Sequence, residues 1–260
     1  MEKGLDAFGT DFYANHQGDI EQYVQEVFLD DPAQIKRMDH LARMVPESAS
    51  SLLDVGAGCG IFLDRLRGVR DLTAEGVELT EDLISWGLKR GHKLSVASAD
   101  RLPYEDRSFD IIVSSEVIEH LPWGVYERTL QELPRVAKDW ILISVPYDER
   151  RNFARCPYCG CTVNPCYHLR SFAPDDLNGL FCGFRLHTTD TIEQISVITT
   201  LKSYFPAPWH SQLVCTSCGY RTQSQDSRSR DRRISKVKEW IRAIPLPKRP
   251  RWLVGLYKRE

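Results

Sequence analysis

A buried strand that leads directly into a glycine-rich turn constrains this 260-residue chain more than any other feature. The segment is Ser51–Gly60, with the sequence SLLDVGAGCG. Its leucines and valine supply an apolar strand. Gly56, Gly58 and Gly60 then allow a tight turn and the close approach of a ligand to the backbone. Ile61–Leu66 begins a helix whose N-terminal amides would face the same ligand, so the pattern predicts an α/β fold with a ligand-binding loop.

Two carboxylates follow this loop at the ends of the next two predicted strands. Leu72–Glu78 reads as a strand that ends in an acid about twenty residues past the loop, where a carboxylate can accept both hydroxyls of a ribose. Leu94–Ala97 predicts a third, short strand, and Asp100 follows it in a place to accept a hydrogen bond from an adenine amino group. The order of these acids predicts a nucleoside site.

A fourth apolar strand, Ser108–Glu116, ends in polar residues. Glu116–Leu121, with the sequence EVIEHL, then lies at the carboxyl end of that strand. Ligands of open parallel sheets bind at this edge, so the segment is expected to face the same site.

Together these segments resemble the class I S-adenosylmethionine-dependent methyltransferases. Within that class they look like small-molecule methyltransferases that carry an Asp-x-Gly-x-Gly-x-Gly loop and a Glu-x-x-Glu-His segment after strand four. The resemblance runs from about Ser50 to Pro146, and more weakly to His187. It implies an α/β fold with a Rossmann-like, seven-stranded, mostly parallel sheet and helices on both faces.

The resemblance also implies which residues hold S-adenosylmethionine. The loop glycines pack on the methionine part, Glu78 holds the ribose and Leu79 packs on the adenine. Asp100 reads the adenine amino group, Asp54 reaches the methionine ammonium through water, and Glu116 lines the methionine pocket. The expected cofactor-binding set is Asp54, Gly56, Ala57, Gly58, Gly60, Glu78, Leu79, Asp100, Arg101 and Glu116.

A nicotinamide dinucleotide site is the main alternative for this stretch. That fingerprint requires Gly-x-Gly-x-x-Gly, whereas the third glycine here comes one residue early and Ile61 stands in its place. The Asp100 segment also has no counterpart in that fingerprint. A structural turn with solvated acids explains any one motif, but four motifs in order argue against it.

Two copies of Cys-x-x-Cys-Gly begin at Cys156 and Cys215. Such a knuckle aims two sulfurs at one ion, and two knuckles form a tetrahedral four-thiolate zinc site, which is structural because it leaves no open position. Four free cysteines remain the alternative, and Cys161, Cys166 or His168 could replace a ligand. His168 could also face the substrate. The expected metal ligands are Cys156, Cys159, Cys215 and Cys218.

The implied topology explains the long separation of the two pairs. The first follows strand five, Trp140–Pro146, and the second lies between strand six, Phe184–Thr189, and the last strand, Arg251–Lys258. Strand six is expected to run parallel to strand five, so both connections would leave the carboxyl edge of the sheet. We therefore expect zinc to staple two insertions, at about 150–168 and 203–222, into a cap over the substrate pocket.

The lead-in to the sheet is expected to be helical. Residues 1–46 would form an N-terminal lid, and 47–260 the methyltransferase domain. Asp31 is placed to cap a helix that Pro32 begins, and a further helix is expected over Ala173–Phe181. The apolar positions of the first helix recur at helical spacing at Ile35, Met38, Leu41 and Met44.

Charge is distributed unevenly along the chain. Arg221–Glu260 carries a net charge of +9 and the rest carries −11. The basic segment is either a solvated surface or a contact with an anionic partner, such as nucleic acid or a membrane surface. Within it, Ile234–Arg242 has the pattern of a short amphipathic helix.

The N-terminus lacks the pattern of a secretory signal, and no apolar run is long enough to cross a bilayer. We therefore expect a cytoplasmic protein, with peripheral membrane contact as an alternative. Eight cysteines in that compartment favour metal ligands or free thiols over disulfides. Cys59 and Cys182 are expected to be buried thiols.

Methyl transfer requires the acceptor to be held in line with the reactive methyl group. A hydroxyl acceptor also loses a proton, and His120 is the best candidate base because it follows strand four and titrates near neutral pH. A packing role is the alternative for His120. Ser114–Glu116 stands where amino-DNA methyltransferases carry Asn or Asp, Pro-Pro and an aromatic residue, which argues against a base amino group as acceptor.

We therefore expect methyl transfer to a hydroxyl of a small molecule, sugar or lipid-linked intermediate. One alternative is an RNA methyltransferase that grips its substrate with the zinc cap and the basic tail. The other is a non-catalytic, zinc-bearing binding protein that retains the cofactor fold.

Overall fold

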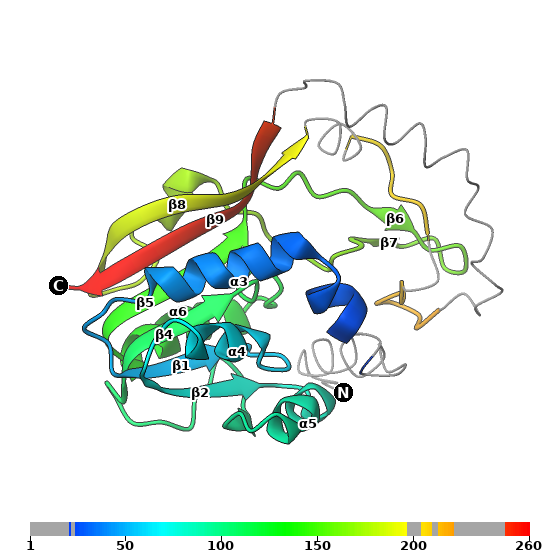
Figure 1. Ribbon diagram of the computed structural model, residues 1–260. Coiled ribbons are helices and arrows are strands. Elements are labelled where there is room, and N and C mark those ends of the chain that lie inside the picture. Colours follow the sequence, from blue (N-terminus) through cyan, green and yellow to red (C-terminus); the bar gives the residue numbers. More distant parts are fainter. Residues whose placement is uncertain (1–20, 22–23, 197–203, 210–212, 221–247) are drawn as a thin grey trace. The chain divides into compact units, whose positions relative to one another are not determined.

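The computed structural model divides the chain into two compact units. The first unit comprises Met1–Glu149, His168–Glu193 and Pro250–Glu260, and the second comprises Arg150–Tyr167 and Gln194–Arg249. The residues that the structure describes are 21, 24–196, 204–209, 213–220 and 248–260 (Figure 1). Most of the expected lid before Gln25, and the amphipathic segment Ile234–Arg242, lie outside these residues.

Seven strands of the first unit form one sheet in the order β3-β2-β1-β4-β5-β9-β8. The strands β1 to β5 pair in parallel, β9 runs antiparallel to β5, and β8 runs opposite to β9 (Figure 1). This arrangement confirms the predicted Rossmann-like sheet. The bounds are β1 Ser51–Val55, β2 Thr73–Glu78, β3 Leu94–Val96, β4 Phe109–Ser115, β5 Ala137–Pro146, β8 Phe184–Ser196 and β9 Lys248–Arg259.

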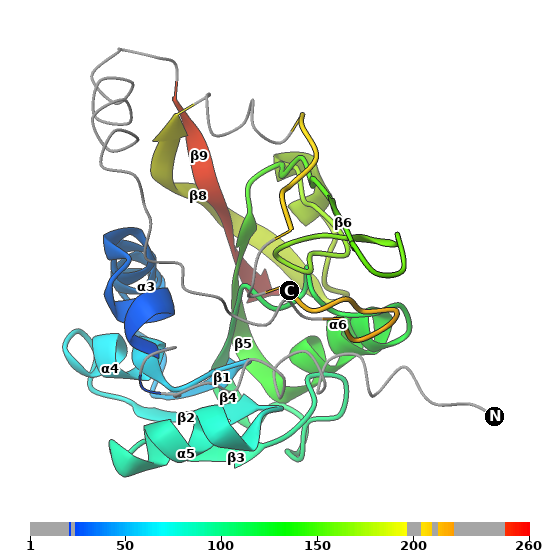
Figure 2. The same ribbon diagram turned by 90° about the vertical axis from the view of Figure 1, so that its right-hand side faces the viewer.

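Helices cover both faces of this sheet because neighbouring strand residues point to opposite sides. Leu52 packs with the apolar residues of α3, α4 and α5, whereas its neighbour Leu53 packs with those of α6. Figure 2 shows α3 and α4 on one side of the strands and α6 on the other. The helix bounds are α3 Pro32–Met44, α4 Ile61–Arg67, α5 Glu81–Lys89 and α6 Val125–Val136, and a single π-helical turn, η1, spans Gln25–Leu29.

The start of α3 confirms the predicted cap. The Asp31 side chain accepts a hydrogen bond of 2.9 Å from the Ala33 amide, and Pro32 occupies the first turn. Met38 and Leu41 are buried on the face that packs against the sheet. The lid function of this region stays a prediction.

Three expectations for the region after β5 are wrong. The helix over Ala173–Phe181 is only a 3-10 turn, η2, Pro174–Leu177, because Asn178 is extended and Gly179 has a φ of +68°. The sixth strand extends to Ser196 rather than Thr189, along a partner that itself begins earlier than expected. Cys182 is exposed, since it lies in the turn before β8 rather than in the core.

The second unit contains a small antiparallel pair, β6 Ala154–Arg155 and β7 Thr162–Val163. Ala154 also forms a bridge to Ala207, which ties the two segments of this unit together. Among the residues that the structure describes, no helix has both the length and the hydropathy needed to cross a bilayer.

Candidate functional site

The glycine-rich turn between β1 and α4 has the backbone that its sequence predicts. Gly56 has a φ of +79°, and a Cβ atom there would lie 2.3 Å from Cγ2 of Val117. Gly58 has a φ of +54°, and a Cβ atom there would meet nothing within 4 Å. The first glycine therefore lets the turn pack against the segment after β4, and the second faces open space where a ligand can approach the backbone.

Glu78, at the end of β2, is bound to this turn. Its carboxylate accepts hydrogen bonds from the amides of Gly58 at 3.0 Å, Leu79 at 2.7 Å and Thr80 at 3.2 Å. Burial raises the pKa of Glu78, and the three amides oppose that rise. The structure thus brings together the turn and the acid that the resemblance assigns to the ribose, with the half-buried Leu79 beside them.

Asp54 is buried near the end of β1, 3% exposed. Burial and then the charge of Glu78 raise the pKa of Asp54 to about 7, while the charge of Arg37 lowers it. The carboxyl group therefore exchanges its proton near neutral pH in the absence of a bound cation.

We expect this pKa to make cofactor binding pH-dependent. The ammonium of the cofactor favours an ionised Asp54, so binding below pH 7 must first displace a proton. Affinity for S-adenosylhomocysteine should rise by up to about tenfold per pH unit on approach to pH 7 and flatten above it. Calorimetry between pH 5.5 and 8.5 measures this, with Asp54→Asn as the variant that loses the dependence. An unchanged wild-type affinity over that range would remove Asp54 from the binding equilibrium.

Asp100 lies in the turn after β3, close in the backbone to Glu78, whose carbonyl accepts the Ala97 amide at 3.1 Å. Oδ2 of Asp100 accepts hydrogen bonds from Nε and Nη2 of Arg128 at 2.8 and 2.6 Å. Oδ1 of Asp100 accepts one from the Ser98 hydroxyl at 2.5 Å. Burial would raise the pKa of Asp100, but these bonds outweigh it and the pKa lies below its usual value.

Asp100 is therefore an ionised carboxylate whose oxygens both have protein partners. Arg101 follows with an exposed side chain, and its amide donates to the Ser98 carbonyl. Within the described residues, no hydrogen bond or ion pair joins Asp100 or Arg101 to the glycine turn, and their predicted roles toward adenine stay predictions.

Glu116 follows β4 with a φ of +57°. Its Oε2 accepts a hydrogen bond from Nε1 of Trp252 at 2.8 Å, and its Oε1 lies 3.5 Å from Nη1 of Arg37. The same Arg37 nitrogen donates to Ser115 at 2.6 Å and to Ser144 at 3.3 Å. The charge pair fastens α3 to the carboxyl ends of β4 and β5, at the edge where ligands of such sheets bind.

Sequence analysis missed Arg37 and Trp252. Arg37 is 4% exposed and lies on the buried face of α3 beside Met38 and Leu41. An arginine within an apolar helical stripe requires an anionic partner, and that requirement is a sequence signal that a partner exists without saying which acid it is.

His120 lies in the turn after β4, and its ring meets the ring of His168 edge to face, with centroids 4.6 Å apart. Glu119 is fully buried, with one carboxyl oxygen 3.9 Å from Nε2 of His120. Burial, and then the charge of Glu116, raise the pKa of Glu119 well above its usual value. Nδ1 of His168 is in turn paired with the Glu149 carboxylate. The structure thus places His168, which sequence analysis had named as a candidate to face the substrate, beside His120, and it adds Glu119 and Glu149 around the two rings.

Arg170 stabilises the cluster formed by Glu119, His120, Glu149 and His168. Its Nη1 donates to the carbonyls of Ile118, at 2.8 Å, and Leu121. The guanidinium lies 3.8 Å from the ring centroid of Tyr126, and the neighbouring Leu169 amide donates to the Glu119 carbonyl at 2.8 Å. These bonds fix the segment after β5 against the turn after β4, a contact that sequence spacing alone does not indicate.

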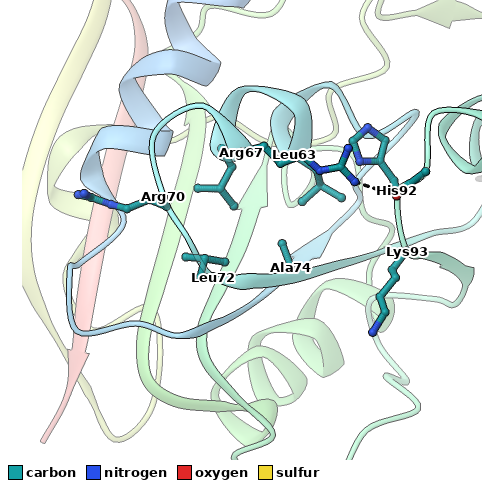
Figure 3. Close-up of a pocket in the computed structure, with 9 residues that line it drawn as sticks. Leu63, Arg67, Arg70, Leu72, Ala74, His92 and Lys93 are labelled. Atoms are coloured by element: carbon teal, nitrogen blue, oxygen red, sulfur yellow. Dashed lines mark hydrogen bonds between the residues drawn. The ribbon is translucent and has the colours of Figure 1, made fainter.

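The cavity shown in Figure 3 lies elsewhere, between α4 and the starts of β2 and β3. It holds about 280 Å³, and none of the expected cofactor residues lines it. Arg67, one of its lining residues, donates a hydrogen bond to the Gly91 carbonyl at 2.8 Å. Its lining residues are Leu63, Leu66, Arg67, Arg70, Leu72, Ala74, Gly91, His92 and Lys93.

The two cysteine knuckles of the second unit have the same backbone. In the first, the Gly160 amide donates to the Cys156 carbonyl at 3.0 Å; in the second, the Gly219 amide donates to the Cys215 carbonyl at 2.8 Å. Both glycines have positive φ, +77° and +70°. The sulfurs of the four predicted ligands lie within 4.8 Å of one another, and those ligands are Cys156, Cys159, Cys215 and Cys218. Four converging thiols of this kind fit a tetrahedral zinc ion.

Cys161 lies beside this group, with its sulfur 3.3 Å from that of Cys159 and 3.1 Å from that of Cys215. It is therefore an alternative ligand that is placed to exchange with a member of the set. His168 belongs to the other cluster, in the first unit. The predicted placement of the zinc insertions as a cap over the pocket stays a prediction.

Comparison with known proteins identifies the family. Residues 21–186, more than half of the chain, match the family described as "Methyltransferase domain". The chain belongs to this methyltransferase family. Its sheet order and glycine turn are those of the class I S-adenosylmethionine-dependent methyltransferases.

Two relatives resemble this methyltransferase over part of their length. The 27-O-demethylrifamycin SV methyltransferase of Amycolatopsis mediterranei is 29% identical over 167 residues, which cover 55% of this chain and 59% of the relative. A probable S-adenosylmethionine-dependent methyltransferase of Mycobacterium tuberculosis is 29% identical over 191 residues, covering 66% of this chain and 67% of the relative. The chain thus spans less than two thirds of the first relative.

Solved structures share the fold of this methyltransferase. A chain of the complex between the Haloferax volcanii Trm112 methyltransferase activator and the putative methyltransferase has a TM-score of 0.57 at 15% identity, covering 96% of this chain and 98% of that one. A SAM-dependent methyltransferase from Archaeoglobus fulgidus has a TM-score of 0.57 at 18% identity, covering 93% and 100%.

Proposed function

We propose that this methyltransferase transfers the methyl group of S-adenosylmethionine to a hydroxyl of a small molecule, sugar or lipid-linked intermediate. The observation that carries the proposal is the polar cluster around His120, at the carboxyl end of β4, in contact through its own turn with the glycine loop. Val117, three residues before His120, packs against Gly56. The rifamycin methyltransferase relative supports a small-molecule acceptor and a hydroxyl as the methylated group, since its name describes an O-demethylated rifamycin as the acceptor.

In this proposal each end of the cofactor has its own partners. Glu78 binds the ribose, the glycine turn packs on the methionine part, and Asp54 attracts the methionine ammonium. The cofactor supplies an electrophilic methyl group on a sulfonium. The protein holds the acceptor oxygen in line with that methyl group, and the hydroxyl loses its proton as the new carbon–oxygen bond forms. We assign the activation of that hydroxyl to His120.

Replacing His120 with glutamine tests this assignment. The turnover rate for a hydroxyl acceptor should fall by about 10²–10⁴-fold, the usual contribution of a group that assists proton transfer. Affinity for S-adenosylhomocysteine should stay within about twofold, because His120 is not among the cofactor-binding residues. His187→Gln, which alters the imidazole packed 5.4 Å from Trp140 on β5, is the matched control. A His120 variant with wild-type turnover would limit this histidine to packing.

We also propose that the second unit holds one structural zinc ion through its four cysteines. The converging sulfurs and the two identical knuckles support this proposal. Cytoplasmic location stays a prediction. RNA methylation is less well supported, because the relative that names its acceptor acts on a small molecule.

A further inference from the structure

The turn after β4 contains a buried carboxylate without a hydrogen-bond partner. Glu119 is 0% exposed, and within the described residues neither carboxyl oxygen accepts or donates a hydrogen bond. One of its oxygens lies 3.9 Å from Nε2 of His120, which is an electrostatic contact but too long for a hydrogen bond. Burying a carboxyl group without a hydrogen-bond partner costs free energy. Such a group is therefore usually protonated or contacts a ligand or a cation.

Two imidazoles converge on this carboxyl. One ligand atom each from Glu119, His120 and His168 lie within 4.8 Å of one another. These three residues come from two chain segments, and the backbone bond from Leu169 to Glu119 fixes their proximity. A cation bound among them would meet one carboxylate oxygen and two ring nitrogens.

The outer partners of the cluster suit a metal site. Nδ1 of His168 is paired with the Glu149 carboxylate, which directs the opposite nitrogen, Nε2, away from that carboxylate. Metal-ligating histidines usually carry such a carboxylate on their second nitrogen. Glu116 is engaged by Trp252 and Arg37, so it is not counted among the ligands.

We propose that Glu119, His120 and His168 bind a divalent first-row transition ion, with Glu149 as the positioning residue behind His168. Two imidazoles and a carboxylate suit zinc, iron(II), cobalt(II) or manganese(II), and three protein ligands leave a position open. This site is distinct in ligand chemistry from the four-thiolate site of the second unit.

The role of the ion rests on the proposed function. An acceptor hydroxyl bound at the open position would have its pKa lowered by the metal, and its proton would leave to solvent as the oxygen attacks the methyl group. His120 would then activate the acceptor as a ligand. The Gly56–Val117 contact keeps this turn beside the cofactor loop, as such a step requires.

Cobalt(II) is a suitable probe because its spectrum separates the two sites. Reduced protein that carries a single equivalent of zinc, at the four-thiolate site, is titrated with cobalt(II), followed by visible absorption and calorimetry. We expect one equivalent to bind with weak visible bands of nitrogen and oxygen ligation, without the intense near-ultraviolet bands of thiolate ligation. His168→Ala should abolish this binding, and Glu149→Gln should weaken it about 10–100-fold. His40→Gln, on α3 outside the cluster, should leave it unchanged.

The proposal is overturned if the wild-type protein binds no cobalt beyond the cysteine site, or if His168→Ala binds it equally well. The milder Glu149→Gln variant keeps the test informative if His168→Ala does not fold, and S-adenosylhomocysteine binding reports the folding of both. No acceptor is present in the titration. The titration therefore tests metal binding separately from methyl transfer. If cobalt does not bind but the protein still transfers methyl groups in a separate assay, the metal site is rejected and the proposed function stands.

Discussion

Glu78→Ala should weaken the binding of S-adenosylhomocysteine by about 1–3 kcal/mol, the usual cost of losing a charge-assisted hydrogen-bond acceptor. The carboxylate is the expected partner of the ribose hydroxyls, and it also accepts the Gly58 amide at 3.0 Å. Removing it therefore affects both the ligand and the turn that binds it. Isothermal titration calorimetry at pH 7.5 measures the difference.

Glu75→Ala is the matched control for this experiment. Glu75 lies on the same strand, three residues earlier, and its carboxylate pairs with Lys93 at 3.1 Å instead of with the glycine turn. Its loss should leave the affinity within about twofold of wild type. Equal affinities of wild-type protein and Glu78→Ala would show that the cofactor does not contact this carboxylate.

Cys218→Ser should release the metal of the second unit. The wild-type protein should contain one zinc per chain at this site, and binding to structural sites of this type contributes about 10–16 kcal/mol at neutral pH. With one thiolate lost, we expect the zinc content to fall and the second unit to exchange its amide hydrogens faster, while the sheet of the first unit keeps its protection. Metal analysis and hydrogen exchange measure the two effects.

Two controls define the ligand set. Cys182→Ser changes an exposed thiol outside the cluster and should keep the zinc. Cys161→Ser should also keep it if the four predicted cysteines are the ligands, whereas its loss of zinc would place Cys161 in the set. Freshly reduced wild-type protein without zinc, or a Cys218→Ser variant that retains it, would contradict the proposal.

Local patterns were sufficient to predict the parts of the fold that follow from neighbouring residues. The apolar run Leu52–Val55 and the glycines after it specify a strand and a turn by backbone chemistry alone. Asp31 and Pro32 specify a helix start in the same way. The sheet order was accessible only through the family resemblance, because strand periodicity does not state which strands pair.

Contacts between distant segments were not predictable from these patterns. Arg37 pairs with Glu116, which lies 79 residues later in the sequence. The segment that begins at His168 contacts the turn after β4, although Arg150–Tyr167 of the second unit separates the two in the sequence. The sequence of β8 after Thr189 is also too polar to indicate a strand, although β8 extends to Ser196 because it pairs with β9. In each case the partner, rather than the segment itself, decides the structure.

Transfer of a labelled methyl group tests the central claim most directly. The protein is incubated with S-adenosylmethionine carrying a trideuterated methyl group and with a metabolite and lipid extract, and the products are examined by mass spectrometry. We expect a hydroxyl-bearing acceptor to gain one labelled methyl as an ether, with one S-adenosylhomocysteine formed for each product, and we expect His120→Gln to form both about 10²–10⁴-fold more slowly. Label found only on nitrogen or in RNA, or cofactor binding without any labelled product, would contradict this account.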